Sequence, residues 1–390
     1  MRKDALFDYL SASADELDAT LAEARRTCPV MRLRDGSVLV IDHEHVQSVA
    51  RRPDLFTARA ASAGASAELD TTADVIAPLF DQDPDSGHTA TRRALQPHFT
   101  RRRVQEWADY IRTVTQTRLA ELLPRGRCDA TTDIAGYLPW PLTAGLLGIP
   151  ERQRDEYRTL AQAAFSPTVA ASDTAAFESF LRDQIRRARQ APDDGMISTI
   201  LATPTALGRL PTTAAVLRWA VIMSGAGSLT SRDLLSSILL HLADDRHMRA
   251  RVTADRSLLP TLVDEMARHQ SAVWASGRTA RDSTQLGDLR LEPGTTVVQC
   301  WGAAARDPAR HDNPDEVRLD RRPGAHLGWG SGPHTCIGRP LALVALPAIL
   351  NVVLDAIPDF QLAPGASPRR TTGRLRGIDT LPLIWPTPGH

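Results

Sequence analysis

Residues 329–338, with the sequence WGSGPHTCIG, constrain the fold of this chain more than any other stretch. Their glycines and proline predict a tight loop that presents Cys336 at the start of an apolar helix over residues 337–357. A sulfur atom at a helix N-terminus lies near free N–H donors and the positive end of the helix dipole, which favours thiolate over thiol. A lone cysteine beside an apolar run is most often a small buried side chain. The loop around Cys336 instead predicts a metal-ligating thiolate.

This loop resembles the haem-thiolate loop of the cytochrome P-450 family. The matching positions hold Trp329, Gly330, Gly332, His334, Cys336 and Gly338. The family often has phenylalanine where this chain has Trp329, and tryptophan is also found there. The resemblance implies haem b with Cys336 as the iron ligand, and a mainly α fold with a small β subdomain, the cytochrome P-450 fold. It extends over residues 28–383, nearly the whole chain.

Composition excludes several other classes of protein. The chain has 390 residues, is 42% hydrophobic, and balances 46 basic against 46 acidic side chains, so nothing favours binding to nucleic acid or a membrane surface. Its four cysteines are far apart, which predicts neither disulfides nor a zinc site. The start of the chain has no long apolar segment, so we expect a cytoplasmic protein without a membrane anchor. Length alone suggests two or three domains, but the resemblance implies a single domain over residues 1–390, with residues 1–27 as a peripheral tail.

The first third of the chain contains a predicted hairpin and a long loop. Short β-patterned runs flank Asp35 and Gly36, a typical turn pair, and a short helix follows them. Residues 58–87 lack periodicity, and a loop of this length is functional or disordered. The resemblance implies that they form a mobile wall of the substrate pocket.

Two cationic side chains follow this loop. His88 and Arg92 lie four residues apart and share one face of a predicted helix, which by itself is typical of a solvated basic surface. The resemblance implies that they bind haem propionates together with Arg278 and His334. Positive charge would offset carboxylates that the macrocycle otherwise buries without compensation.

Residues 212–243 have the longest helical pattern, with glycines near its middle. Periodicity leaves open one helix or two helices joined by a turn, since each internal glycine costs about 1 kcal/mol. The resemblance implies one helix over the haem, with the family pattern alanine or glycine, glycine, any residue, acid, threonine. Placed on Ser224, Gly225, Gly227 and Ser228, this pattern has Gly227 instead of the acid and Ser228 instead of the threonine. These four are the predicted catalytic residues, and the missing acid predicts that the substrate takes part in proton delivery.

Glu265 and Arg268 lie three residues apart on a later predicted helix, at a spacing that is common for surface pairs. The resemblance implies that they form a buried ion pair behind the haem. Its third partner is left open between Arg318 and Arg321.

We therefore expect a haem-thiolate oxidoreductase that oxidises a small organic substrate, such as a natural-product intermediate. Because the chain has no flavin or iron–sulfur motif, electrons would come from a ferredoxin and an NAD(P)H-dependent ferredoxin reductase. The ferredoxin would dock near Arg92, Arg93 and Arg339. Two alternatives stay open, which are oxidative C–C or C–N coupling of an aromatic substrate without oxygen insertion, and a non-catalytic haem-binding homologue or sensor.

Overall fold

A computed structural model describes residues 14–58, 88–204 and 208–387. The loop expected over residues 58–87 therefore lies outside the described residues, except for its first residue. The chain divides into two compact units. The first contains Met1–Ser66, Asp233–Cys336 and Leu362–Pro382, and the second contains Ala67–Arg232, Ile337–Gln361 and Leu383–His390. The single domain stays a prediction, and each unit is described by itself below.

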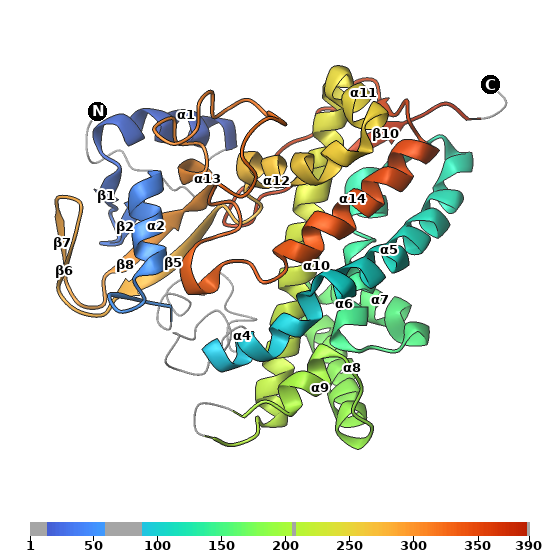
Figure 1. The fold of residues 1–390 in the computed structure, drawn as a ribbon, viewed down its shortest axis with the longest axis horizontal. Coiled ribbons are helices and arrows are strands. Elements are labelled where there is room, and N and C mark those ends of the chain that lie inside the picture. Colours follow the sequence, from blue (N-terminus) through green and yellow to red (C-terminus); the bar gives the residue numbers. More distant parts are fainter. Residues whose placement is uncertain (1–13, 59–87, 205–207, 388–390) are drawn as a thin grey trace. The chain divides into compact units, whose positions relative to one another are not determined.

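The described chain is mainly helical, as predicted (Figure 1). The α-helices are α1 (Ala14–Thr27), α2 (His43–Arg51), α4 (Thr89–Leu95), α5 (Arg101–Leu122), α6 (Pro139–Leu147), α7 (Arg154–Ala164), α8 (Ala171–Gln190), α9 (Met196–Leu201), α10 (Thr213–Asp244), α11 (Arg246–Ala254), α12 (Leu259–Gln270), α13 (Trp301–Ala304) and α14 (Arg339–Ala356).

The largest sheet, in the first unit, has the strand order β1-β2-β8-β5-β3. These strands are β1 (Val30–Arg32), β2 (Val38–Val40), β3 (Phe56–Thr57), β5 (Ala275–Ala280) and β8 (Thr296–Cys300). The predicted hairpin is confirmed, because β1 and β2 pair antiparallel and Gly36 has a positive φ of 84° in the turn. The sheet also contains a parallel pair, β2 with β8, which joins strands far apart in the sequence.

Smaller sheets complete the β structure. A two-stranded sheet consists of β6 (Thr284–Leu286) and β7 (Leu289–Leu291). A three-stranded sheet has the order β4-β10-β9, formed by β4 (Arg127–Asp129), β10 (Pro382–Ile384) and β9 (Gln361–Leu362).

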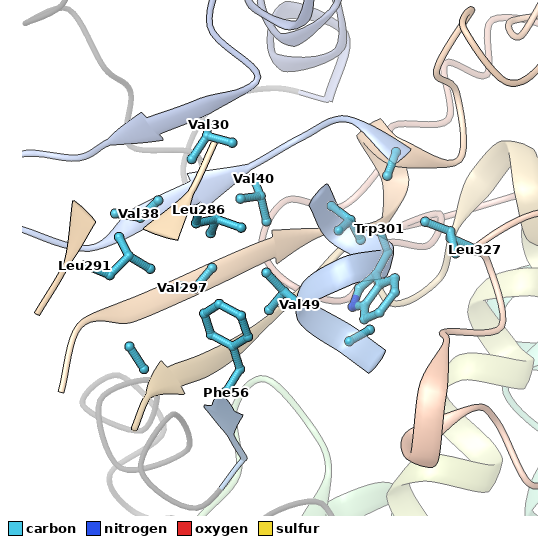
Figure 2. Packing of buried hydrophobic residues seen from close by; sticks show 14 residues of the cluster. Val30, Val38, Val40, Val49, Phe56, Leu286, Leu291, Val297, Trp301 and Leu327 are labelled. Carbon is cyan, nitrogen blue, oxygen red and sulfur yellow. The ribbon is translucent and has the colours of Figure 1, made fainter. Parts of the chain in front are cut away.

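The core of the first unit lies on both faces of the large sheet. Successive residues of a strand point to opposite faces. Val38 and Val40 of β2 therefore pack on one face together with α2 (Figure 2), and Leu39 packs on the other. Helix α1 covers that other face with Leu17 and Leu21, which are fully or almost fully buried. Leu17, Leu21 and Ala24 of α1 thus belong to this core, although the sequence predicts a peripheral tail over residues 1–27.

Helix α14 is a long, apolar helix of the second unit. Among the described residues, the stretch Gly332–Ala356 is long and apolar enough to cross a membrane by length and composition alone. However, 56% of its apolar window is buried, and α14 packs along α5 (Figure 1). Burial of this kind is typical of the core helix of a globular protein.

Candidate functional site

Cys336 ends a loop whose backbone is held in a defined geometry. Gly330 and Gly332 have positive φ angles of 74° and 70°, which residues with a Cβ rarely adopt. A Cβ at Gly332 would also clash with the carbonyl oxygen of Ala50. The loop is closed by the Cys336 N–H, which donates to the carbonyl oxygen of Trp329 at 2.8 Å. These glycines are therefore required by the path of the backbone.

The loop leads directly into helix α14. Gly338 is the N-cap of this helix, and Pro340 lies in its first turn, where a missing N–H costs little. Cys336 precedes the N-cap by two residues. Its position close to the N-terminus of α14 agrees with the prediction.

The four cysteines all lie within the described residues and differ in exposure. Cys300 is fully buried, and burial raises the pKa of its thiol above the usual range. Burial likewise raises the pKa of Cys128 to about 12. Cys28 is half-buried, whereas Cys336 is exposed. Because a metal-ligating cysteine must be accessible, Cys336 is the best suited of the four to bind a metal.

Glu265 and Arg268 of α12 form a buried ion pair, with side chains 4% and 1% exposed. Arg268 donates from Nε to Glu265 Oε2 at 2.9 Å and from Nη2 to Oε1 at 2.7 Å. The third partner that the sequence left open is also present. Arg321 donates from Nε to Glu265 Oε1 at 3.0 Å, and the backbone N–H of Arg318 donates to the same oxygen at 3.0 Å.

The residues predicted to bind propionates divide between the two units. In the first unit, Arg278 lies in β5, where its Nη1 donates to the carbonyl oxygen of Gly277 at 2.7 Å, and His334 ends the short helix η8 (Gly332–His334). In the second unit, His88 is the N-cap residue of α4 and is buried, while Arg92 lies four residues later in α4 and is half-buried. Their binding of a propionate stays a prediction.

Of the two arrangements that periodicity left open, the structure has the single helix that the resemblance implied, because α10 runs continuously from Thr213 to Asp244. Ser224 and Ser228 are both fully buried. Ser224 donates to the carbonyl oxygen of Ala220 at 2.7 Å, and Ser228 donates to Oγ1 of Thr143 in α6 at 3.0 Å. Both predicted hydroxyls are therefore engaged in packing within the second unit.

Close packing also accounts for the glycines in this part of α10. A Cβ at Gly225 would lie 2.8 Å from a ring carbon of Phe165, and one at Gly227 would lie 2.9 Å from Oγ1 of Thr143. Contacts this short are not tolerated between ordinary side chains. Glycine at these positions lets neighbouring elements of the second unit approach the backbone of α10.

Thr230, which the sequence interpretation did not single out, lies nearly opposite Ser228 on α10, because the helix turns about 100° per residue. Thr230 is half-buried and donates from its hydroxyl to the carbonyl oxygen of Ala226 at 2.7 Å. A signal for it was present, since the family pattern can also be placed two residues later. Ala226, Gly227 and Thr230 then match, and only the acid is missing, replaced by Leu229.

Comparisons with known proteins identify the family of this chain. The family description cytochrome P450 matches residues 210–374. Cytochrome P450 105C1 of Streptomyces sp. is 30% identical over 303 residues, which cover 75% of this chain and 78% of that protein. The Steroid C26-monooxygenase of Mycolicibacterium smegmatis is 28% identical over 371 residues, covering 92% of this chain and 90% of that protein. The crystal structure of a post-tailoring hydroxylase involved in himastatin biosynthesis superposes with a TM-score of 0.85 at 26% identity, covering 96% of this chain and 98% of that one. The chain therefore belongs to the cytochrome P450 family and is a haem-dependent P450 monooxygenase.

Proposed function

We propose that this P450 monooxygenase hydroxylates a small organic intermediate of secondary metabolism in the cytoplasm. The observation that carries the chemistry is the exposed Cys336 thiol on its glycine loop. The substrate class is supported by the similarity to the himastatin hydroxylase, which spans almost the full length of both chains.

The described residues fit haem b, the cofactor of the family. Cys336 is exposed on its loop. In this proposal Arg278 and His334 of the first unit, and His88 and Arg92 of the second, would each donate to a propionate. Cys336 would ligate the iron as a thiolate. When bound, thiolate-ligated haem activates dioxygen with electrons from a redox partner.

We assign the alcohol of the central helix to Thr230 in place of Ser228. The Thr230 hydroxyl is half-buried and uses its hydrogen to bond Ala226, so its oxygen lone pairs are left to accept from a water molecule or a substrate. Ser228 is fully buried and donates towards α6. A hydroxyl in that position supports packing between helices.

The acid of the family pattern is missing in both placements, because either Gly227 or Leu229 stands in its place. Neither side chain carries a titratable proton. We infer that a polar group of the substrate, with ordered water, completes the proton path next to Thr230. Poor substrates that lack this group would consume reducing equivalents and release peroxide.

Electrons would reach the haem from a ferredoxin. Arg93 is exposed, and Arg92 and Arg339 are half-buried. These cations suit the acidic surface of a ferredoxin, and rim charges of this kind act mainly on the association rate.

The thiolate assignment is tested with the purified holoprotein. The reduced carbon monoxide complex of the wild type should show the band typical of thiolate ligation, and Cys336→Ser should lose it. Cys28→Ser, at a half-buried cysteine, is the matched control and should keep the band. If Cys336→Ser also keeps it, the ligand assignment is refuted.

The reaction type is tested by turnover under ¹⁸O₂ with ferredoxin, its reductase and NADPH. Hydroxylation incorporates the label into the product, whereas oxidative coupling gives a product without it, and a non-catalytic homologue gives no product. Steroids belong in the substrate screen, because the M. smegmatis relative is named a Steroid C26-monooxygenase. Tight spectral binding and oxidation of a steroid would replace the proposed substrate class.

A further inference from the structure

A buried carboxylate, Asp264, lies next to the ion-pair residue Glu265 on α12 but serves a different part of the chain. Asp264 is 3% exposed. Its Oδ1 accepts from the indole Nε1 of Trp329 at 2.7 Å, and its Oδ2 accepts from the backbone N–H of Gly324 at 2.6 Å. The Nε2 atom of His326 lies 3.5 Å from the same Oδ2. One carboxylate therefore contacts three residues of the segment that precedes Cys336.

This segment is also fixed internally and against α12. The Gly328 N–H donates to Nδ1 of His326 at 3.0 Å, and the Gly330 N–H donates to the carbonyl oxygen of Leu327 at 2.9 Å. Because Nδ1 of His326 accepts a hydrogen bond, a neutral ring carries its proton on Nε2, which faces Asp264. A Cβ at Gly328 would clash with the carbonyl oxygen of Ala267 in α12. The approach of the segment to α12 is thus close enough to require glycine.

Trp329 connects Asp264 to the cysteine. Its side chain donates to Asp264, and its carbonyl oxygen accepts from the Cys336 N–H at 2.8 Å. Only one residue therefore separates the buried carboxylate from the backbone of the iron ligand.

The hydrogen bond also determines where the indole proton goes. Indole has a single N–H and accepts no hydrogen bond. With that proton bound to Asp264, Trp329 cannot donate to the Cys336 sulfur. A donor to a thiolate withdraws charge from it, and hydrogen bonds around a ligating sulfur are among the means by which a protein sets the haem reduction potential.

We propose that Asp264 is a positioning residue for the haem thiolate. Asp264 acts through the Trp329 indole, holding the Cys336 loop in place and keeping the indole proton away from the sulfur. The inference depends on Cys336 as the iron ligand. It concerns a residue outside the family pattern of the loop, and it gives a function to tryptophan at a position where the family often has phenylalanine.

The test uses purified holoprotein and needs neither substrate nor ferredoxin. The variants are Asp264→Ala, Trp329→Phe and their combination. Asp307→Asn is the matched control, because Asp307 is another buried carboxylate of the first unit, 5% exposed, and accepts from the backbone N–H groups of His43 and Ala309. Two quantities are measured, which are the half-life of the thiolate-type carbon monoxide band at moderate temperature and the haem reduction potential.

We expect Asp264→Ala and Trp329→Phe each to shorten the half-life of the band about tenfold, the lower end for losing an outer-shell partner of a metal ligand. The double variant should be no worse than the poorer single variant, because both changes break the same link. Asp264→Ala should also raise the reduction potential, since a negative charge is lost and the indole proton is released. Asp264→Asn keeps an acceptor for the indole and should recover part of the half-life.

Two results would overturn the inference. If Asp264→Ala lowers thermal stability no differently from Asp307→Asn and leaves both the half-life and the potential unchanged, Asp264 is only structural. If the effects of Asp264→Ala and Trp329→Phe on the half-life multiply, the two residues act independently. A wild-type protein without the thiolate band would instead refute the Cys336 assignment, and this outcome is visible before any variant is made.

Discussion

Replacing Glu265 by glutamine should destabilise this protein more than any other change of a single carboxylate to an amide that we consider. All five N–H donors of Arg268 are used. Two of them bind Glu265, and the other three bind the carbonyl oxygens of Ala305 at 3.1 Å, Pro314 at 2.8 Å and Glu316 at 3.0 Å. Glu265 in turn is the carboxylate partner of both Arg268 and Arg321.

The magnitude follows from burial. With side chains 1% and 14% exposed, Arg268 and Arg321 are poorly compensated by water once the carboxylate is gone. A glutamine also directs an N–H group towards guanidinium donors. Removing one partner of a buried ion pair costs about 3–5 kcal/mol, out of a total stability of roughly 5–15 kcal/mol. With a urea dependence of about 3 kcal/mol per M, the unfolding midpoint should fall by about 1 M or more.

Urea unfolding of the holoprotein, followed by haem absorbance and by far-ultraviolet circular dichroism, measures this shift. Glu316→Gln is the matched control, because the side chain of Glu316 is exposed and only its backbone carbonyl binds Arg268. It should change stability by no more than about 0.5 kcal/mol. The double variant Glu265→Gln/Arg268→Met should recover part of the loss, since the buried charge of Arg268 is then absent. A midpoint for Glu265→Gln equal to that of Glu316→Gln would refute the reasoning.

Three further predictions follow from the site. Thr230→Ala should raise the peroxide released per NADPH consumed. Ser228→Ala should leave this ratio unchanged and cost only about 1 kcal/mol of stability. The reverse pattern would assign the hydroxyl beside the substrate to Ser228. Arg92→Ala and Arg278→Ala should each weaken haem retention on dilution by about 1–3 kcal/mol, because a propionate loses a charged donor, and retention equal to wild type in both would contradict their assignment. Burial opposes ionisation of Asp264, but the nearby His326 and hydrogen bonds from Trp329 and Gly324 outweigh it and lower the pKa of Asp264 to about 2. The folded pKa thus lies below the unfolded value of about 3.9. The resulting stabilisation of roughly 2 kcal/mol is therefore complete above about pH 5 and is lost as the pH falls to about 2. In Asp264→Asn the free energy of unfolding should therefore fall less steeply between about pH 5 and pH 2 than in the wild type. An unchanged pH dependence in this range would count against these hydrogen bonds.

Features set by neighbouring residues could be predicted from the sequence. The turn at Asp35 and Gly36 depends on local backbone preferences, and it forms as expected. The same holds for the loop of Cys336, where two glycines adopt positive φ angles within a few residues of this cysteine. In both cases a short stretch of sequence contains most of the information that the geometry requires.

Features that join distant residues could not be predicted in this way. The parallel pairing of Val38 with Val297 depends on the path of the chain between them. The third partner of Glu265 also stayed undetermined in the sequence, because Arg318 and Arg321 are both arginines of one short segment. The structure uses the two differently, the first through its backbone N–H and the second through its guanidinium.

The central helix shows why a sequence pattern needs a helix face before it can be assigned. The residues 224–228 and 226–230 both contain a glycine followed by a hydroxyl side chain three residues later. Helical periodicity places the two hydroxyls, Ser228 and Thr230, on nearly opposite faces, and burial then distinguishes them, since Ser228 is fully buried and Thr230 is not. The absence of the acid does not depend on this choice, because Gly227 and Leu229 are equally unable to carry a proton. Our proposal that proton delivery depends on the substrate is therefore the same under either assignment, and only the hydroxyl proposed to lie beside the substrate changes.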